Sequence, residues 1–158
     1  MSQQSKRVRF DNAVVIFANL DMPDTYFGDP GTHKVTVAVD GVIQKKIDDA
    51  LIVTGGPKGS SKIKDKIFSE YINVSKNVSN VRKFGSAALD VAYVACGRFD
   101  GYWQRELNYW DIAAGIIILK EAGGYVDFFD EDEKLPLKKN ILASNSFIHE
   151  ELRGLIKK

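Results

Sequence analysis

The sequence predicts a layered α/β domain in which helices pack on a mixed β-sheet. From about residue 50 onward, short runs rich in Val, Ile and Phe alternate with segments whose apolar residues recur at helical spacing. Glycines close several of these segments, and the sequence contains no internal repeat. At 158 residues the chain suits one hydrophobic core and is short for two.

The charge balance and the cysteine content exclude several classes of protein. With 22 basic and 21 acidic residues, the net charge is only +1, and the locally basic residues 6–9 and 157–158 are typical of solvated chain ends. Nucleic acid is therefore not an expected partner. The single cysteine, Cys96, excludes an intramolecular disulfide and a multi-cysteine zinc site. Because no stretch has the apolar character of a signal peptide or a membrane span, we expect a cytoplasmic protein without membrane contact.

The first 46 residues form a segment of strands and turns that we separate from the α/β domain of residues 47–158. Its strand-like runs are residues 8–19, 34–39 and 42–44. Asp40-Gly41 lies between the last two of these runs and is a strong hairpin signal. Residues 20–32 are rich in turn formers.

The elements of the α/β domain follow one another in a regular order. The expected strands are residues 50–54, 78–84, 100–104, 124–129 and 141–144. The expected helices are residues 61–76, 85–95, 111–122 and 146–158. Gly97 and Gly123-Gly124 end the second and third helices, and Ser146 is the expected cap of the last.

Asp111 is the first candidate functional residue, because it precedes an almost unbroken small and apolar run. In the first turn of a helix, an aspartate is favoured by the helix dipole and can cap free N–H groups. The same carboxylate, held by a rigid element, can also coordinate a hard divalent cation. Spacing alone favours the cap. Trp110 would anchor the turn, and Gly115 would allow close helix packing.

The small residues Gly85, Ser86 and Ala87 form the second candidate site, at the expected start of a helix. Such residues allow backbone N–H groups to approach a ligand oxygen. The alternative is a tight strand-to-helix turn, which is the more common use of these residue types.

Residues 110–124, WDIAAGIIILKEAGG, resemble the carboxy-terminal signature of the inositol monophosphatase family. These enzymes belong to a group of Mg²⁺-dependent, often lithium-sensitive phosphomonoesterases. Residues 49–57, 84–103 and 141–152 are similar to further segments of the family in the same order. The resemblance covers residues 47–156 and implies the carboxy-terminal half of that fold.

The resemblance implies roles for the candidate residues. The corresponding aspartate of the family binds a catalytic-site Mg²⁺ and a substrate hydroxyl, which makes Asp111 a metal- and substrate-binding residue. Gly85, Ser86 and Ala87 correspond to residues that line the substrate pocket. Gln104 lies where well-known members have a glutamate that holds the polyol ring. Because an amide both donates and accepts and carries no charge, this departure leaves the substrate preference open.

A second departure concerns the metal ligands. Family enzymes take most of them from an upstream glutamate and an Asp-Pro-x-Asp-Gly-Thr motif, whereas residues 28–32 read GDPGT here and lack the second aspartate. The resemblance therefore implies a Mg²⁺-dependent phosphatase of inositol or sugar phosphates, in a partial chain that lacks most metal ligands and has unassigned catalytic residues. Family members are commonly dimers, so we expect a homodimer. The alternative is a non-catalytic interaction or dimerisation module derived from the family.

Overall fold

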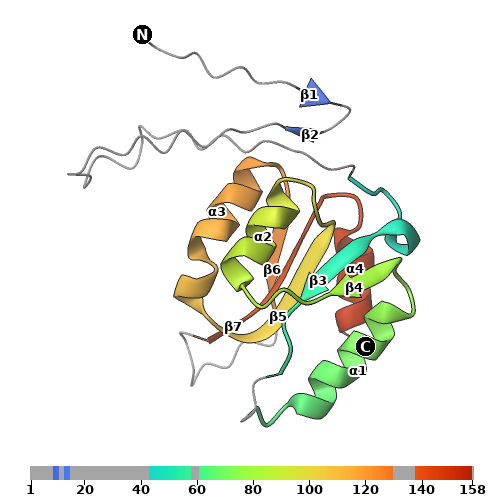
Figure 1. The fold of residues 1–158 in the computed structure, drawn as a ribbon, viewed down its shortest axis with the longest axis vertical. Coiled ribbons are helices and arrows are strands. Elements are labelled where there is room, and N and C mark those ends of the chain that lie inside the picture. The colour runs from blue at the N-terminus through green and yellow to red at the C-terminus, as the bar shows by residue number, and fades with distance from the viewer. Residues whose placement is uncertain (1–8, 11–12, 15–42, 58–60, 130–137, 158) are drawn as a thin grey trace, which may run out of the picture.

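The computed structural model describes residues 9–10, 13–14, 43–57, 61–129 and 138–157. The described residues from 43 onward form an α/β fold around a five-stranded mixed sheet (Figure 1). The strands of this sheet are β3 (Leu51–Thr54), β4 (Asn80–Arg82), β5 (Gly101–Asn108), β6 (Tyr125–Phe128) and β7 (Lys138–Ser144). The α-helices are α1 (Lys64–Ser75), α2 (Ala87–Ala95), α3 (Ala113–Glu121) and α4 (His149–Ile156). Two 3-10 turns, η1 (Ile47–Asp49) and η2 (Tyr109–Asp111), precede β3 and α3. This architecture confirms the predicted fold class.

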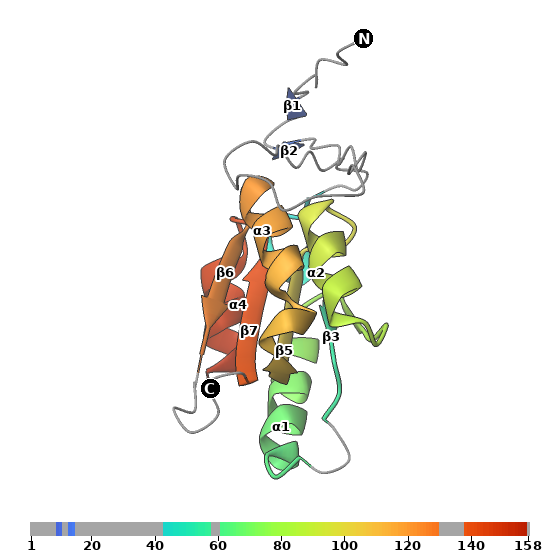
Figure 2. The same cartoon turned by 90° about the vertical axis from the view of Figure 1, so that its left-hand side faces the viewer.

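The strand order β4-β3-β5-β7-β6 determines where the helices lie. Strands β4, β3 and β5 are parallel, whereas β7 is antiparallel to both of its neighbours. The connection from β3 to β4 and the connection from β4 to β5 run in opposite directions across the sheet. Because parallel crossovers are right-handed, their helices α1 and α2 lie on opposite faces. Figure 2 shows α2 and α3 side by side on one face and α4 on the other.

The side chains of β5 alternate between two hydrophobic cores, one on each face of the sheet. Tyr102 packs in the core under α2 and α3, and Trp103 packs in the core under α1 and α4. Both side chains are fully buried. The neighbouring strand β7 alternates in the same way, with Ile141 and Leu142 in different cores.

Close packing of α2 on α3 depends on Gly115. A Cβ atom at this position would lie 2.9 Å from the Cβ of Val91 and 3.6 Å from the carbonyl oxygen of Ala88. The expectation that Gly115 permits a close helix contact is therefore confirmed. The contact also brings the first turns of the two helices together.

A buried polar network joins the amino ends of β3 and β5 to α4. The Asp100 carboxylate accepts the N–H groups of Gln44 and Leu51 at 2.8 and 2.9 Å and the side-chain amide of Asn145 at 3.1 Å. The Asn145 side-chain oxygen in turn accepts the backbone N–H groups of residues 147 and 148. The predicted cap Ser146 is therefore wrong, because the preceding asparagine satisfies these N–H groups and α4 begins only at His149.

Other differences from the predicted elements lie at strand ends. Strands β5 and β7 continue beyond the predicted residues 100–104 and 141–144, because they pair with each other on both sides of a bulge. The described part of the predicted strand 8–19 consists of two short antiparallel strands, β1 (Arg9–Phe10) and β2 (Ala13–Val14). Residues 43 and 44 lie outside any strand, and the predicted Asp40-Gly41 hairpin lies outside the described residues.

Arg105 and Glu70 form a buried ion pair between β5 and α1. The guanidinium Nε donates to Glu70 Oε1 at 2.7 Å and stacks over the Phe129 ring, with its central carbon 4.6 Å from the ring centroid. Glu70 Oε2 is buried without a hydrogen-bond partner in the described part of the chain. The carboxylate therefore depends on one arginine for its compensation.

We expect Arg105→Met to lower the free energy of unfolding by about 3–5 kcal/mol, because it leaves the Glu70 carboxylate buried and uncompensated. The double variant Arg105→Met/Glu70→Leu should recover most of this loss, since both charges are then absent. Urea unfolding followed by circular dichroism measures both. The matched control is Arg153→Met, which removes a half-buried arginine paired with Asp127 and should cost less than about 1 kcal/mol. A double variant less stable than Arg105→Met would contradict this interpretation.

Candidate functional site

The candidate site surrounds the hydroxyl of Tyr102, on the face of the sheet that α2 and α3 cover. The hydroxyl donates a hydrogen bond to Gln104 Oε1 at 2.7 Å. Burial, together with the negative charges of Asp90 and Asp111, raises the pKa of Tyr102 far above its usual range. The phenol therefore stays protonated and acts as a hydrogen-bond donor.

Gln104 lies against the carboxyl end of β3. In the register of the sheet Thr54 is paired with Trp103, so the next residues of the two strands, Gly55 and Gln104, are neighbours. A Cβ atom at Gly55 would lie 2.1 Å from both Cδ and Oε1 of Gln104. Only glycine at position 55 leaves room for the Gln104 amide in this position.

Asp111 ends the η2 turn and does not cap α3. The helix begins at Ala113, and its N-cap residue Ile112 has non-helical dihedral angles that separate Asp111 from the first helical turn. One Asp111 oxygen, Oδ2, accepts a hydrogen bond from the side-chain amide of Asn108 at 3.2 Å. Its Oδ1 has no hydrogen-bond partner among the residues that the structure describes. The expected helix cap is therefore wrong, and one carboxylate oxygen is available to a ligand.

Trp110 does not anchor this turn as the sequence predicts. Its side chain is 64% exposed, and that of Tyr109 is 45% exposed. The reason is that Ile112, which is fully buried, supplies the anchor that connects η2 to the core.

The predicted small-residue segment lies at the start of α2, at the same edge of the sheet. Gly85 has φ = +86°, a conformation that favours glycine. Ser86 occupies the N-cap position but makes no side-chain cap hydrogen bond, and Ala87 is the first helical residue. The first N–H groups of α2 are therefore not satisfied by a capping side chain.

The amino ends of α2 and α3 point in the same direction at this edge. Helix α2 begins after β4 and helix α3 begins after β5, and both of these strands run parallel to β3. The contact of Gly115 with Val91 places the first turns side by side. Two helix dipoles therefore present their positive ends to one region, which favours an anionic ligand.

Asp90 is a buried carboxylate to which the sequence patterns assign no role. It is 1% exposed, and neither carboxylate oxygen has a hydrogen-bond partner within the described ranges. Burial raises the pKa of Asp90 from 3.8 to about 6. An aspartate within the apolar helix AALDVAYVA is the signal that identifies it in the sequence.

The described residues do not form a complete metal site. Among them, no group of three or more His, Cys, Asp or Glu side chains is arranged to hold a metal ion. Asp111 offers the oxygen chemistry that Mg²⁺ prefers, but a Mg²⁺ site normally has six oxygen ligands, including water. The described part of the chain thus supplies one carboxylate that fits such a site, and Asp111 as a metal ligand stays a prediction.

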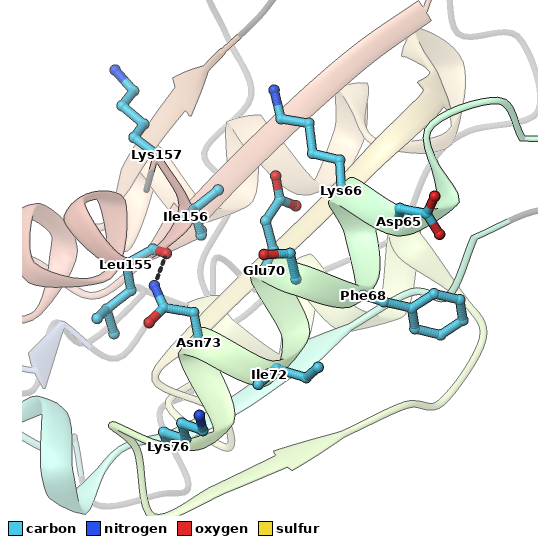
Figure 3. Close-up of a pocket in the computed structure, with 11 residues that line it drawn as sticks. Asp65, Lys66, Phe68, Glu70, Ile72, Asn73, Lys76, Leu155, Ile156 and Lys157 are labelled. Atoms are coloured by element: carbon cyan, nitrogen blue, oxygen red, sulfur yellow. Dashed lines mark hydrogen bonds between the residues drawn. The ribbon is translucent and has the colours of Figure 1, made fainter.

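A groove of about 940 Å³ lies on the opposite face, between α1 and α4 (Figure 3). Its walls include the exposed side chains of Phe68 and Ile72 and a hydrogen bond from the Asn73 amide to the Leu155 carbonyl. The groove is separated from Gln104 and Asp111 by the sheet. It therefore does not contribute to the candidate site.

A serine, a histidine and an aspartate contact one another in the order of a hydrolytic triad: Ser144, His149 and Asp127. Unlike a catalytic triad, this group is not accessible to a substrate. Ser144 Oγ lies 2.7 Å from His149 Nδ1, and His149 Nε2 lies 3.5 Å from Asp127 Oδ2. Ser144 is fully buried, and its hydroxyl also donates to the Asn145 carbonyl. A substrate cannot reach it, so the arrangement joins β6, β7 and α4 rather than supplying a nucleophile.

Comparison with known proteins establishes the family. The sequence profile of the inositol monophosphatase family matches residues 26–158. An inositol-1-monophosphatase of Caulobacter vibrioides is 41% identical over 110 residues, which are 69% of this chain and 43% of that protein. The Nus factor SuhB of Pseudomonas aeruginosa is 36% identical over 107 residues, covering 65% of this chain and 39% of that protein.

The fold agrees with this relationship. The crystal structure of the suhB protein of Bartonella henselae matches with a TM-score of 0.66 and 41% identity, over 75% of this chain and 45% of that one. An inositol monophosphatase from Anabaena matches with a TM-score of 0.62 and 34% identity. The chain belongs to the inositol monophosphatase family. It spans less than half the length of the Caulobacter, Pseudomonas and Bartonella relatives. No helix in the described ranges is long and apolar enough to span a bilayer.

We expect Asp90 to make the stability of the fold depend on pH. Its pKa is higher in the folded chain, about 6, than its ordinary value of 3.8, so the folded state binds the proton more tightly. The stabilisation is complete below about pH 4 and is lost as the pH rises through 6. Between pH 4 and 7 the wild type should lose about 2 kcal/mol more than Asp90→Asn.

Urea unfolding at several pH values measures this difference. The control is Asp48→Asn, which changes an exposed aspartate in η1 and should leave the pH dependence of the wild type unaltered. Parallel curves for the wild type and Asp90→Asn would contradict the assignment.

Proposed function

We propose that this chain is the carboxy-terminal part of a Mg²⁺-dependent phosphomonoesterase, a cytoplasmic hydrolase of phosphorylated polyols or sugars. The observation that carries the proposal is the Asp111 carboxylate. It presents one oxygen without a described partner beside the amino ends of two parallel helices, in a member of the inositol monophosphatase family. In this proposal residues 47–158 are the family domain, and residues 1–46 are a divergent segment.

In this proposal, different residues of the chain bind different groups of the substrate. The uncapped N–H groups at Gly85, Ser86 and Ala87 hold the anionic ester, which the two helix dipoles also favour. Gln104 holds a second group of the substrate, and Asp111 holds a substrate hydroxyl and a metal oxygen site. When bound, Mg²⁺ supplies charge neutralisation at the phosphoryl oxygens.

Further carboxylates must complete the metal site, and we infer that they come from outside the described ranges or from another polypeptide. Within this chain the acidic residues of the amino-terminal segment are the candidates: Asp21, Asp24, Asp29 and Asp40. We assign no catalytic base, because the position of no described side chain identifies it as the group that would take a proton from the attacking water.

The enzyme proposal predicts release of inorganic phosphate from inositol 1-phosphate that requires both Mg²⁺ and Asp111. Asp111→Asn should lower the rate at least about 100-fold, because a neutral amide neither binds the cation nor orients the hydroxyl as the carboxylate does. Colorimetric phosphate detection with and without Mg²⁺ measures the effect, and Asp48→Asn is the matched control. The proposal would be contradicted if no phosphate were released, or if the rate of release did not depend on Mg²⁺ and on Asp111.

A second candidate function is that of a non-catalytic interaction module, and an exposed apolar surface favours it. Leu89 on α2 and Ile117 on α3 are 53% and 58% exposed on helices that pack against each other. Large apolar side chains exposed on two neighbouring helices are typical of an interaction surface. Some relatives carry the name Nus factor SuhB instead of the name of an enzyme. We propose that the partner at this surface is a second copy of the chain.

We therefore expect a homodimer whose dissociation constant rises at least about tenfold in Ile117→Lys, since a charge would be buried at the contact. Analytical ultracentrifugation measures the change. The matched control is Ile72→Lys on α1, where an isoleucine is equally exposed, at 54%, on the opposite face. A wild-type chain that is monomeric at all concentrations would contradict the dimer.

A further inference from the structure

We propose that the groove between α1 and α4 is a docking site for an acidic amphipathic helix of a partner protein. The groove has a volume of about 940 Å³ and lies on the face of the sheet opposite the candidate site (Figure 3). The enzyme proposal and the dimer proposal assign no role to its residues. The docking site is therefore independent of both.

One wall of the groove carries a row of apolar side chains that the fold leaves exposed. Phe68 and Ile72 are four residues apart on α1, so they are neighbours on the helix surface, and each is more than half exposed. Lys76 continues the same row one turn later. A row of this spacing is the ridge that packs into the groove of a second helix. Its exposed apolar side chains suit the apolar face of an amphipathic helix.

The opposite wall comes from the last turn of α4, and polar contacts hold α1 in place beside it. The Asn73 side-chain amide donates a hydrogen bond to the Leu155 carbonyl, as the dashed line in Figure 3 shows. The buried ion pair of Glu70 with Arg105 fixes α1 to β5. A ligand that binds between walls already in position causes little reorganisation of the protein. The groove is therefore preformed.

Positive charge surrounds the apolar row. Lys66 lies near the start of α1, Lys76 follows its last turn, and Lys157 follows the last turn of α4. Among the described residues that line the groove, Asp65 is the one exposed acid, because the Glu70 carboxylate is buried in its ion pair. The excess of positive charge in this one groove exceeds the net charge of +1 of the whole chain. Charge complementarity therefore favours an acidic partner.

The spacing of these groups defines the partner further. Lys66 and Lys76 are separated by roughly 15 Å along α1, at 1.5 Å per residue. A helix that lies along α1 then needs acidic residues near both of its ends, with apolar residues at i, i+4 spacing between them. A small anion does not reach lysines this far apart. Two copies of the groove facing each other would bring like charges together, which disfavours a second copy as the occupant.

The probe is a lactam-bridged peptide of about 14 residues, slightly longer than α1, because unbridged helices of this length are marginal in water. It carries leucines at i, i+4 spacing and glutamates near both ends. The control peptide has lysines in place of the glutamates. Fluorescence anisotropy with labelled peptides gives the dissociation constant, which we expect to be about 10 µM for the glutamate peptide, as for a small transient interface. The lysine peptide should bind at least about tenfold more weakly.

Two variants test whether the groove is the binding surface. Phe68→Ser removes a ring from the apolar row, and Lys76→Glu/Lys157→Glu inverts two charges; each should raise the dissociation constant at least about tenfold. The double variant should also prefer the lysine peptide, a reversal that misfolding does not produce. Lys120→Glu is the matched control and should leave binding unchanged, because Lys120 is an exposed lysine in the last turn of α3, on the other face.

Chemical shifts of ¹⁵N-labelled protein locate the bound glutamate peptide, and we expect changes in α1 and α4 but not in α2 and α3. The inference is overturned if the peptide does not bind at concentrations up to about 1 mM, if both peptides bind equally well, or if the changes lie in α2 and α3. It is also overturned if the α1 and α4 signals shift with protein concentration alone, since a second copy then fills the groove.

Discussion

Strand β5 is the constraint on which the rest of the domain depends. It pairs with parallel β3 on one side and antiparallel β7 on the other, and before its bulge its side chains alternate between the two faces of the sheet. The alternation places Tyr102 under α2 and α3 and Trp103 under α1 and α4. Two residues further on, it directs Gln104 to the first face and Arg105 to the second. The candidate site and the buried ion pair are therefore consequences of one strand's pleat.

The two faces treat buried charge differently. On the α1–α4 face, Glu70 is compensated by Arg105, whose guanidinium also stacks on Phe129. On the α2–α3 face, Asp90 has no such partner in the described part of the chain. An uncompensated carboxylate weakens a fold, and such groups occur most often at functional sites. The α2–α3 face, where the Asp90 carboxylate is uncompensated, is also the face to which we assign the proposed chemistry.

Much of the fold can be predicted from the sequence, because the hydrophobic periodicity of each helix and the composition of each strand are local properties. The helices at residues 61–76 and 85–95 and the strand at residues 50–54 are confirmed within a few residues. Asn145 replaces the predicted cap Ser146, because both are good capping residues and only the loop geometry decides between them. The fully buried Ile112, and not Trp110, fixes the η2 turn. Neighbouring apolar residues do not reveal which of them faces the core.

The candidate site could be predicted only in part. Gly85, Ser86, Ala87, Gln104 and Asp111 are identifiable through family resemblance, and their roles stay predictions. Tyr102 has no signal in the sequence, because a tyrosine in a buried strand looks like any other core aromatic. Its importance comes from the position of its hydroxyl beside Gln104, which only the three-dimensional structure reveals.

The contact between Gly55 and Gln104 also has a meaning for sequences beyond this one. Because a Cβ atom at position 55 would overlap the Gln104 amide, the two positions are not free to vary independently. A chain with this backbone and a larger residue in place of Gly55 must have a shorter side chain, or a displaced one, in place of Gln104. A joint substitution at positions 55 and 104 can be recognised from sequence alone. It would therefore mark those family members whose ligand recognition differs from that of this chain.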